Sequence, residues 1–406
     1  MQASTYPLID PDEAAALVLQ EVAVLGEEEL PLAACPNRVL AQDLIADQDL
    51  PSFPSSAVDG YALRAADAGR RLPLAGEAAA GRPLEGGLPP AAAARILTGG
   101  MLPEGADTVI MLEEVRAGAD WVEAPGGLQP GANYHPPGAD LAAGTRVLSR
   151  GDVLGSAELG LAAALNRPFL SVHRRPRVAL MSTGDELVPV GGRPEGGQII
   201  DSNRWALLAA LREAGAEVSL LPAAPDDPAQ LRQLVLEALS EHEVLVTSGG
   251  VSVGSHDLVK PLLESLGKVH IGRVKLKPGK PFTFATLSPG RVAFGLPGFP
   301  VSSLVTFEVF VRPALRRMQG FRQLQRPRLP VRLDFDAKSA AGRAEYHRVS
   351  LRRQGGELVA QTTGSQSSSR LLSLVGAGAL VRVPPGDEPL RRGSQVEALI
   401  LSLPSD

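Results

Sequence analysis

The alternation of apolar and polar positions is most regular between residues 176 and 320, where short β-type runs alternate with helical segments. Apolar runs bounded by turn residues predict strands, and apolar positions spaced three and four apart predict helices. This order predicts a mostly parallel sheet with helices on both faces. We expect strands at residues 177–182, 216–223, 243–248, 268–276, 282–286 and 291–296, and helices at residues 204–215, 229–242, 256–267 and 301–320.

The segments on either side carry other patterns. Residues 10–25 and 151–166 have helical spacing, the first with Asp10 as the predicted cap and Pro11 at its first position. Between them, residues 55–140 hold short β runs interrupted by Gly and Pro. Residues 327–406 alternate as short strands, which is typical of a small barrel or sandwich.

A chain of 406 residues is too long for a single core, so several domains are expected. The fold class is predicted to be multidomain α/β, with a central, mostly parallel α/β domain. The predicted units are a helical and extended linking domain (residues 1–54 with 141–175), a β-rich insertion domain (55–140), the α/β domain (176–325) and a C-terminal β-barrel domain (326–406).

Charge and cysteine content narrow the function classes. A formal net charge of −5 gives no global field for nucleic acid or anionic lipid, and no run reaches the roughly 18 apolar residues of a membrane span. The single Cys35 excludes an intrachain disulfide, and the first residues lack the pattern of a signal peptide. We expect a cytoplasmic protein that binds neither nucleic acid nor membrane. The Arg-rich C-terminal part is either a solvated face or a basic surface for an anionic ligand.

Carboxylates follow several strands of the predicted sheet. Thr183, Gly184, Asp185 and Glu186 end one strand, and further acidic residues follow others. Carboxylates gathered at one sheet edge repel one another unless a cation lies among them, so Mg²⁺ is predicted here. The alternative is that the acidic pair only forms a turn or a cap. The predicted metal ligands are Glu186, Asp201 and Asp257, with Asp226 at the same edge.

A hydroxyl- and Gly-rich loop, residues 247–255, precedes a predicted helix. Its backbone N–H groups could cradle a phosphate, although a plain flexible loop is the alternative. It is not a P-loop, because Ser255 stands where that motif needs lysine. Together with the acidic loop, it predicts a pocket for a phosphorylated ligand and a divalent cation. The predicted phosphate contacts are Thr183, Ser248, Gly249, Gly250 and Ser252.

Cationic side chains follow the predicted strand 268–276. Strand alternation puts Arg273, Lys275 and Lys277 on one face, which suggests that this strand lines a polar cleft, and Lys280 follows directly. A further anion site is predicted at Ser302 and the adjacent Ser303, in the first turn of the last helix of the α/β segment. The scattered histidines and the absence of HExxH, GxSxG and GxGxxG patterns argue against zinc, serine-hydrolase and dinucleotide chemistry.

These loops resemble those of a known family, the molybdopterin molybdenumtransferases, which are bacterial relatives of the gephyrin E domain. The resemblance covers nearly the whole chain. It is carried by SSAVDGYA (55–62), RILTGGMLPEGADTVIMLEE (95–114), PPGADL (136–141), STGDEL (182–187), GQIIDSN (197–203), TSGGVSVGSHD (247–257) and KPGKPF (277–282).

The resemblance implies an elongated homodimer of four-domain subunits that inserts molybdate into adenylylated molybdopterin, with Mg²⁺-dependent release of AMP. It implies a molybdopterin adenylyltransferase and apo-molybdoenzymes as partners. Two alternatives are an adenylyltransferase-like enzyme of the same fold and a pterin-binding or cofactor-assembly scaffold without turnover.

The family's site residues carry over by motif. Glu186, Asp226, Asp257 and Lys277 would act in the α/β domain, and Asp59, Thr98 and Asp140 would come from the β insertion. Arg348 and Ser368 would belong to the C-terminal domain and face the partner subunit's cleft.

The chain departs from the family pattern at two places. Phe299 stands where the family usually has asparagine, and Arg273 where lysine is common. We expect the Phe299 ring to be absorbed by packing, so that its replacement by asparagine would destabilise the fold. The alternative is that the usual asparagine holds the ligand, in which case this chain binds ligand more weakly and Phe299→Asn would tighten binding.

Overall fold

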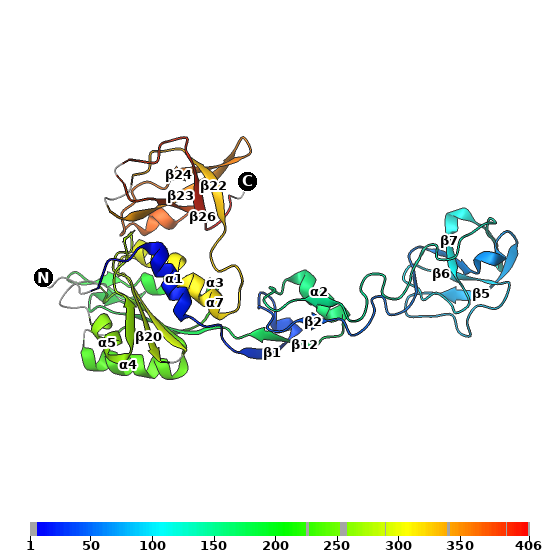
Figure 1. Cartoon of the computed structure of the whole chain (residues 1–406), viewed down its shortest axis with the longest axis horizontal. Coiled ribbons are helices and arrows are strands. Elements are labelled where there is room, and N and C mark those ends of the chain that lie inside the picture. Colours follow the sequence, from blue (N-terminus) through cyan, green and yellow to red (C-terminus); the bar gives the residue numbers. More distant parts are fainter. Residues whose placement is uncertain are drawn as a thin grey trace.

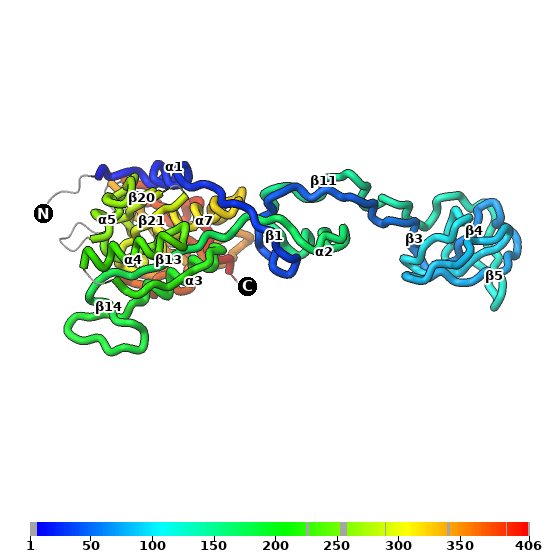
Figure 2. The backbone as a smooth tube through the Cα atoms, turned by 90° about the horizontal axis from the view of Figure 1, so that it is seen from below, coloured from blue at the N-terminus to red at the C-terminus, as the bar shows by residue number. Residues whose placement is uncertain are grey.

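The computed structural model describes residues 6–224, 227–251, 258–288, 290–338, 342–386 and 388–404. The molecule is elongated (Figure 1). The α/β segment and the C-terminal strands lie together at one end, the β insertion lies at the other, and slender paired strands join them, as Figure 2 also shows.

The central sheet has the strand order β16-β13-β17-β21-β20-β18. The first four strands run parallel, and β20 pairs antiparallel with both of its neighbours. The prediction of a mostly parallel sheet is confirmed. The strands are β13 (Arg177–Ser182), β16 (Glu217–Leu220), β17 (Val244–Ser248), β18 (Lys268–Ile271), β20 (Thr283–Ser288) and β21 (Arg291–Leu296).

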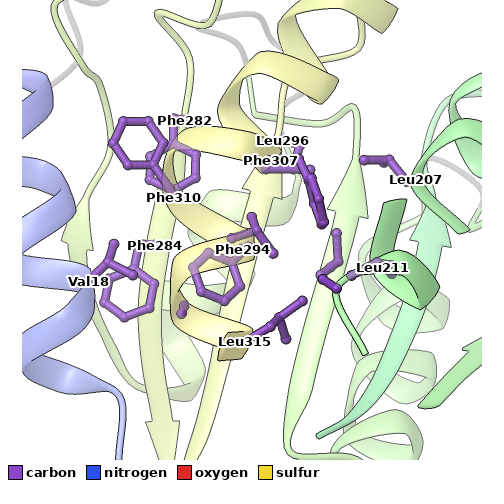
Figure 3. Close-up of a cluster of buried hydrophobic side chains, with 14 of the residues drawn as sticks. Val18, Leu207, Leu211, Phe282, Phe284, Phe294, Leu296, Phe307, Phe310 and Leu315 are labelled. Atoms are coloured by element: carbon purple, nitrogen blue, oxygen red, sulfur yellow. The ribbon is translucent and has the colours of Figure 1, made fainter. Parts of the chain in front are cut away.

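Helices cover both faces of this sheet, as predicted. On one face α3 and the final helical segments pack over an aromatic core in which the rings of Phe282 and Phe310 stack 4.4 Å apart (Figure 3). On the other face α4 and α5 bury a smaller, Ala- and Leu-rich cluster. The helices are α3 (Asn203–Glu213), α4 (Pro228–Glu241), α5 (Val259–Leu266), α6 (Pro300–Thr306), the π-helical η4 (Phe307–Val311) and α7 (Arg312–Met318).

Two predicted elements differ from the structure. The single strand expected at 268–276 stops at Ile271, because Gly272 packs so closely on Tyr6 that a Cβ there would lie 2.6 Å from the ring. The chain resumes as β19 (Leu276–Lys277), which pairs with the C-terminal domain instead. The helix expected at 10–25 is α1 (Pro11–Glu21), capped by the Asp10 carboxylate as predicted, and the chain is extended beyond it.

Helix α1 packs on the α/β core. Ala14, Val18 and Val22 are buried there, and Val18 lies beside Phe284 in Figure 3. The predicted linking domain includes residues 1–54, but the first helix of this range packs on the α/β domain instead. The other domain boundaries remain predictions.

Paired strands build the connection to the insertion. The helix predicted at 151–166 is the shorter α2, which starts after Gly155, and it packs on a small core around Leu40 and Leu154. The elements are β1 (Glu27–Pro31) with β12 (Phe169–His173), β2 (Leu44–Ile45) with β11 (Arg146–Leu148), β3 (Ser55–Ser56) with β10 (Tyr134–His135), α2 (Ser156–Ala164) and η1 (Leu32–Ala34).

The insertion is a six-stranded sheet of order β7-β4-β6-β5-β9-β8. Its cores gather around Leu63 and Ile96, and the predicted β-rich character is confirmed. The elements are β4 (Gly60–Leu63), η2 (Ala65–Asp67), β5 (Arg71–Ala78), β6 (Ala93–Ile96), β7 (Thr108–Met111), η3 (Leu112–Glu114), β8 (Arg116–Ala117) and β9 (Trp121–Glu123).

The C-terminal strands close into a barrel, because β23 pairs with β25 as well as with β24. Between barrel and sandwich, the two forms typical of this pattern, the structure selects the barrel. The elements are β22 (Arg328–Leu333), β23 (Ala344–Gln354), β24 (Glu357–Thr362), η5 (Leu371–Leu374), β25 (Ala379–Val383) and β26 (Gln395–Ile400), and the short pair β14 (Leu187–Val188) with β15 (Ile199–Ile200) projects from the α/β domain.

Candidate active site

A cavity of about 1040 Å³ lies at the carboxyl ends of β13, β17 and β21, which is the edge where α/β sheets place ligands. The barrel closes part of it through the loop of residues 365–368. Ten of the predicted site residues line this one cavity. They are Thr183, Glu186, Asp201, Ser248, Gly249, Gly250, Lys277, Lys280, Ser302 and Ser368.

The ends of β13 and β17 approach each other too closely for ordinary side chains. Gly184 has φ +132°, and a Cβ on it would lie 2.3 Å from the Glu186 carboxylate. Gly249 has φ +91°, and its Cβ would meet the Thr183 carbonyl oxygen at 2.6 Å. These glycines let the carboxylate fold back toward the cavity and let the second loop lie against the first.

The described carboxylates of the cavity are Glu186, which is exposed, and Asp201, which is 6% exposed. One Asp201 oxygen accepts the Arg204 backbone N–H at 3.1 Å, so this residue caps α3 as well as facing the cavity. Asp226, Asp257 and Ser252 lie outside the described residues. Carboxylate oxygens are the donors that Mg²⁺ prefers, and two of them would leave positions for water and ligand phosphate. The donor set therefore fits Mg²⁺, although no cluster of three or more candidate ligands occurs among the described positions.

Asn203, the first residue of α3 and no candidate site residue in the sequence analysis, joins three parts of the site. Its amide donates to the Ser248 hydroxyl at 2.8 Å and to the Gly298 carbonyl at 2.6 Å. Ser302 lines the cavity but is 4% exposed, and the Ser303 hydroxyl donates to the Pro297 carbonyl. Asn203 thus holds the strand-end loops of β17 and β21 together at the start of α3.

A basic wall contains Lys277 and Lys280 from the α/β domain and Arg343 from the barrel. Arg343 precedes β23 directly, and no motif marked it in the sequence. The prediction that Arg273 and Lys275 share this wall is wrong, because the described lining does not include them.

The side chains of Arg273 and Lys275 lie outside the described cavity lining, in the segment where the chain turns between β18 and β19. The Arg273 guanidinium donates to the Tyr6 carbonyl at 2.6 and 3.1 Å. Lys275 is exposed, and its backbone N–H donates to the Ile9 carbonyl at 2.7 Å.

Arg348 organises the barrel loop and is not among the described residues that line the cavity, so its contact with substrate stays a prediction. Its side chain is fully buried, and burial lowers its pKa to about 10. The guanidinium donates to the Tyr346 and Ser367 carbonyls at 3.1 and 3.2 Å and to the Ser373 hydroxyl at 3.1 Å. Arg348 therefore acts through the loop that it holds.

Ser368 reaches the cavity of its own chain, where its carbonyl accepts the Val301 backbone N–H at 3.2 Å. The sequence predicted that Ser368 faces the partner subunit's cleft, whereas here it lines the cavity of its own chain. Folding of the barrel onto the α/β domain brings the two together within one subunit.

Asp59 directly precedes β4 and Thr98 follows β6, and both strands belong to the insertion, which lies at the end of the molecule away from the α/β domain (Figure 1). The Asp59 carboxylate accepts the backbone N–H and the hydroxyl of Thr98, at 2.7 and 2.8 Å, and both residues are exposed. Asp140 is also exposed, and its backbone N–H donates to the Leu50 carbonyl at 3.0 Å. Within one chain these residues do not meet the cavity.

Phe299 is 59% exposed at the cavity wall, where it precedes α6. The expectation that its ring is absorbed by packing is wrong. The turn is instead held through the Gly298 carbonyl, which accepts a hydrogen bond from the Asn203 amide at 2.6 Å.

Comparison with known proteins agrees with this architecture along the whole chain. Residues 9–166 match the MoeA N-terminal region (domains I and II), residues 179–317 a probable molybdopterin binding domain, and residues 330–401 the MoeA C-terminal region (domain IV). Together these matches cover the linking and insertion segments, the α/β domain and the barrel.

Curated relatives point the same way. The chain is 37% identical to a molybdopterin molybdenumtransferase of Nostoc sp. over 93% of this chain and 89% of that protein. It is 34% identical to gephyrin of Dictyostelium discoideum over 98% of this chain, and it spans 63% of that protein's length.

A solved structure shares the arrangement of domains. The molybdopterin biosynthesis MoeA protein of Pyrococcus horikoshii superposes with a TM-score of 0.84 at 32% identity, over 97% of this chain and 99% of that one. The chain belongs to the molybdopterin molybdenumtransferase (MoeA) family.

Proposed function

We propose that this protein inserts molybdate into adenylylated molybdopterin and releases AMP. The observation that carries the proposal is a single cavity lined by two carboxylates, Glu186 and Asp201, and by the cations Lys277, Lys280 and Arg343. A ligand with a phosphoanhydride needs its negative charge neutralised as the bond breaks. The family relationship supports the choice of a pterin as the group attached to that phosphate.

In this proposal Glu186 and Asp201 would hold Mg²⁺, with Asp226 and Asp257 as further predicted ligands. A bound Mg²⁺ neutralises phosphate charge and orients the phosphoanhydride. Lys277, Lys280 and Arg343, which also line the cavity, would bind the phosphate oxygens. Gly249 and Gly250 line the same cavity, but the Gly249 backbone N–H already donates to the Leu296 carbonyl at 3.0 Å. When water attacks the adenylyl phosphorus, the phosphoanhydride bond breaks, AMP leaves and the pterin keeps its own phosphate. When a molybdate oxygen attacks instead, the pterin phosphate leaves in the same way, and water must then hydrolyse the adenylyl-molybdate to release AMP.

We also propose that the active form is a homodimer in which a second copy supplies the insertion. Asp59 and Thr98 cannot act at the cavity of their own chain because the insertion lies at the opposite end of the molecule. Asp140 lies beside Leu50 in the connection to the insertion, and the described cavity lining does not include it. In an elongated homodimer, each insertion would lie over the partner's cavity. A molybdopterin adenylyltransferase would deliver the substrate, and apo-molybdoenzymes would receive the product.

No helix in the described part is long and apolar enough to cross a membrane. The cytoplasmic location remains a prediction.

The decisive experiment supplies adenylylated molybdopterin, molybdate and MgCl₂ to the purified protein. AMP is measured by chromatography, and the metal content of the pterin by mass spectrometry. We expect both products together, and loss of both with EDTA. AMP release without metal insertion would contradict the transferase proposal, and pterin binding without either product would favour the scaffold alternative. Formation of adenylylated molybdopterin from ATP and molybdopterin would favour the adenylyltransferase alternative.

A matched pair of variants tests the acidic wall. Glu186→Gln should lower AMP release by about a hundredfold, because it removes charge from the predicted cation site. Asp185→Asn is the control, since this neighbour is exposed and the described cavity lining does not include it. Equal losses in the two variants would contradict the assignment of Glu186.

A further inference from the structure

Lys277 faces a carboxylate across the junction between the α/β domain and the barrel. The short strand β19 pairs parallel with β23, and this register sets Lys277 opposite Glu345. The Ala344 backbone N–H donates to the Lys275 carbonyl at 3.0 Å, which fixes the two strands side by side. The Lys277 ammonium nitrogen lies 3.1 Å from one Glu345 carboxylate oxygen.

The two partners differ sharply in burial. The Glu345 side chain is 4% exposed, whereas that of Lys277 is 42% exposed and forms part of the cavity wall. A buried carboxylate is costly unless a charge is paired with it. A half-exposed lysine, in contrast, would otherwise sample many rotamers. The ion pair therefore holds the Lys277 ammonium in a position that its half-exposed surroundings alone would not fix.

The other cations near Glu345 are engaged elsewhere. The His347 ring nitrogen Nε2 lies 3.6 Å from the second carboxylate oxygen, but it also lies 3.0 Å from the Lys338 carbonyl, and burial lowers the pKa of this imidazole. A neutral imidazole that donates to a carbonyl does not neutralise the carboxylate. The Arg348 guanidinium donates to Tyr346, Ser367 and Ser373. Among the ion pairs described for Glu345, the one with Lys277 therefore brings a charged partner into direct contact with the carboxylate.

We propose that Glu345 is a positioning residue that fixes the Lys277 ammonium on the cavity wall, so that the basic wall is preorganised only when the barrel is seated on the α/β domain. This inference rests on the proposed function in one respect, namely that Lys277 binds the phosphates of the substrate. Glu345 itself does not line the described cavity, so its effect on substrate passes through the lysine.

A double-mutant cycle in the full-length enzyme tests this coupling. Glu345→Gln keeps the shape of the side chain and removes its charge, and Lys277→Met removes the ammonium. We expect Glu345→Gln to lower kcat/KM for AMP release by about tenfold in the wild-type background and by less than about twofold in the Lys277→Met background. Equal losses in the two backgrounds would overturn the proposal, because Glu345 would then act independently of Lys277.

A chemical probe tests the restraint without any substrate. The rate of Lys277 acylation by an amine-reactive ester, followed by peptide mass spectrometry, is divided by the rate for the exposed Lys280. We expect this ratio to rise by about threefold to tenfold in Glu345→Gln, since the ion pair no longer shields the amine. An unchanged ratio would overturn the proposal even if the enzyme is active.

The probe also separates the two hypotheses. If wild-type protein releases no AMP, the proposed function fails, whereas a raised acylation ratio still supports the restraint. Glu345→Asp keeps the charge on a shorter side chain and should give a ratio between those of wild type and Glu345→Gln. If Glu345→Gln does not fold, Glu345→Asp takes its place in both experiments. An acylation ratio in Glu345→Asp equal to that of the wild-type protein would then overturn the proposal.

Discussion

The Asp59 carboxylate accepts two hydrogen bonds from Thr98, one from the backbone N–H at 2.7 Å and one from the hydroxyl at 2.8 Å. These bonds, the backbone one first, lower the pKa of Asp59, so the carboxylate stays charged in acid better than an ordinary aspartate does. A lowered folded-state pKa means that the contribution of this pair to stability is present above the unfolded pKa of about 3.9 and is lost as the pH falls through the folded pKa.

This geometry predicts the behaviour of Thr98→Val. The substitution removes the hydroxyl but keeps the backbone N–H, so the pKa of Asp59 should rise part of the way toward its ordinary value. Carboxyl carbon chemical shifts, followed by NMR against pH, would measure the change. Thr98→Ser is the control, because it keeps the hydroxyl and should leave the titration close to that of wild type. An unchanged midpoint in Thr98→Val would contradict the role of the hydroxyl.

Arg348 should matter for the barrel loop more than for direct contact with substrate. Arg348→Lys removes the planar donor group that reaches Tyr346, Ser367 and Ser373. Leaving such buried acceptors unpaired costs about 1–3 kcal/mol of unfolding free energy. Denaturant unfolding would measure this cost, and hydrogen exchange should accelerate in the loop of residues 363–373. A variant as stable as wild type with greatly weakened substrate binding would restore the direct contact predicted from the sequence.

Phe299 offers a test in which the structure and the sequence-based expectation disagree. Because the ring is 59% exposed, Phe299→Asn should change the unfolding free energy by no more than about 0.5 kcal/mol, as for other surface substitutions. The packing interpretation requires a loss of about 1–3 kcal/mol instead. Melting temperature separates these outcomes, and pterin affinity measured alongside shows whether the open ring contacts the ligand.

Local patterns predicted the α/β site well because each strand-end loop is encoded next to its own strand. Thr183, Glu186 and Ser248 reach one cavity since parallel strands end at one edge of the sheet. The failures lie where distant segments meet. Arg273 turns away because Gly272 must pack on Tyr6, and the pairing of Lys277 with Glu345 depends on how the barrel folds back. Neither contact leaves a periodic signal in the sequence.

The placement of the barrel also changes how a shared site should behave in mixed dimers. Ser368 lines the cavity of its own chain, whereas Asp59 lies at the far end. If the second copy supplies Asp59, a dimer of one Glu186→Gln subunit and one Asp59→Asn subunit contains one site with both residues intact. Mixing two inactive homodimers after subunit exchange should then restore activity, up to about half of the wild-type rate per mixed dimer.

The matched control pairs Glu186→Gln with Lys277→Met. Both residues line the same cavity of one chain, so each site of that mixed dimer carries one substitution and no activity should return. AMP release, with exchange verified by native mass spectrometry of differently tagged subunits, provides the measurement. Restoration in the control pair, or none in the Asp59 pair despite complete exchange, would show that the insertion does not act on the partner's cavity.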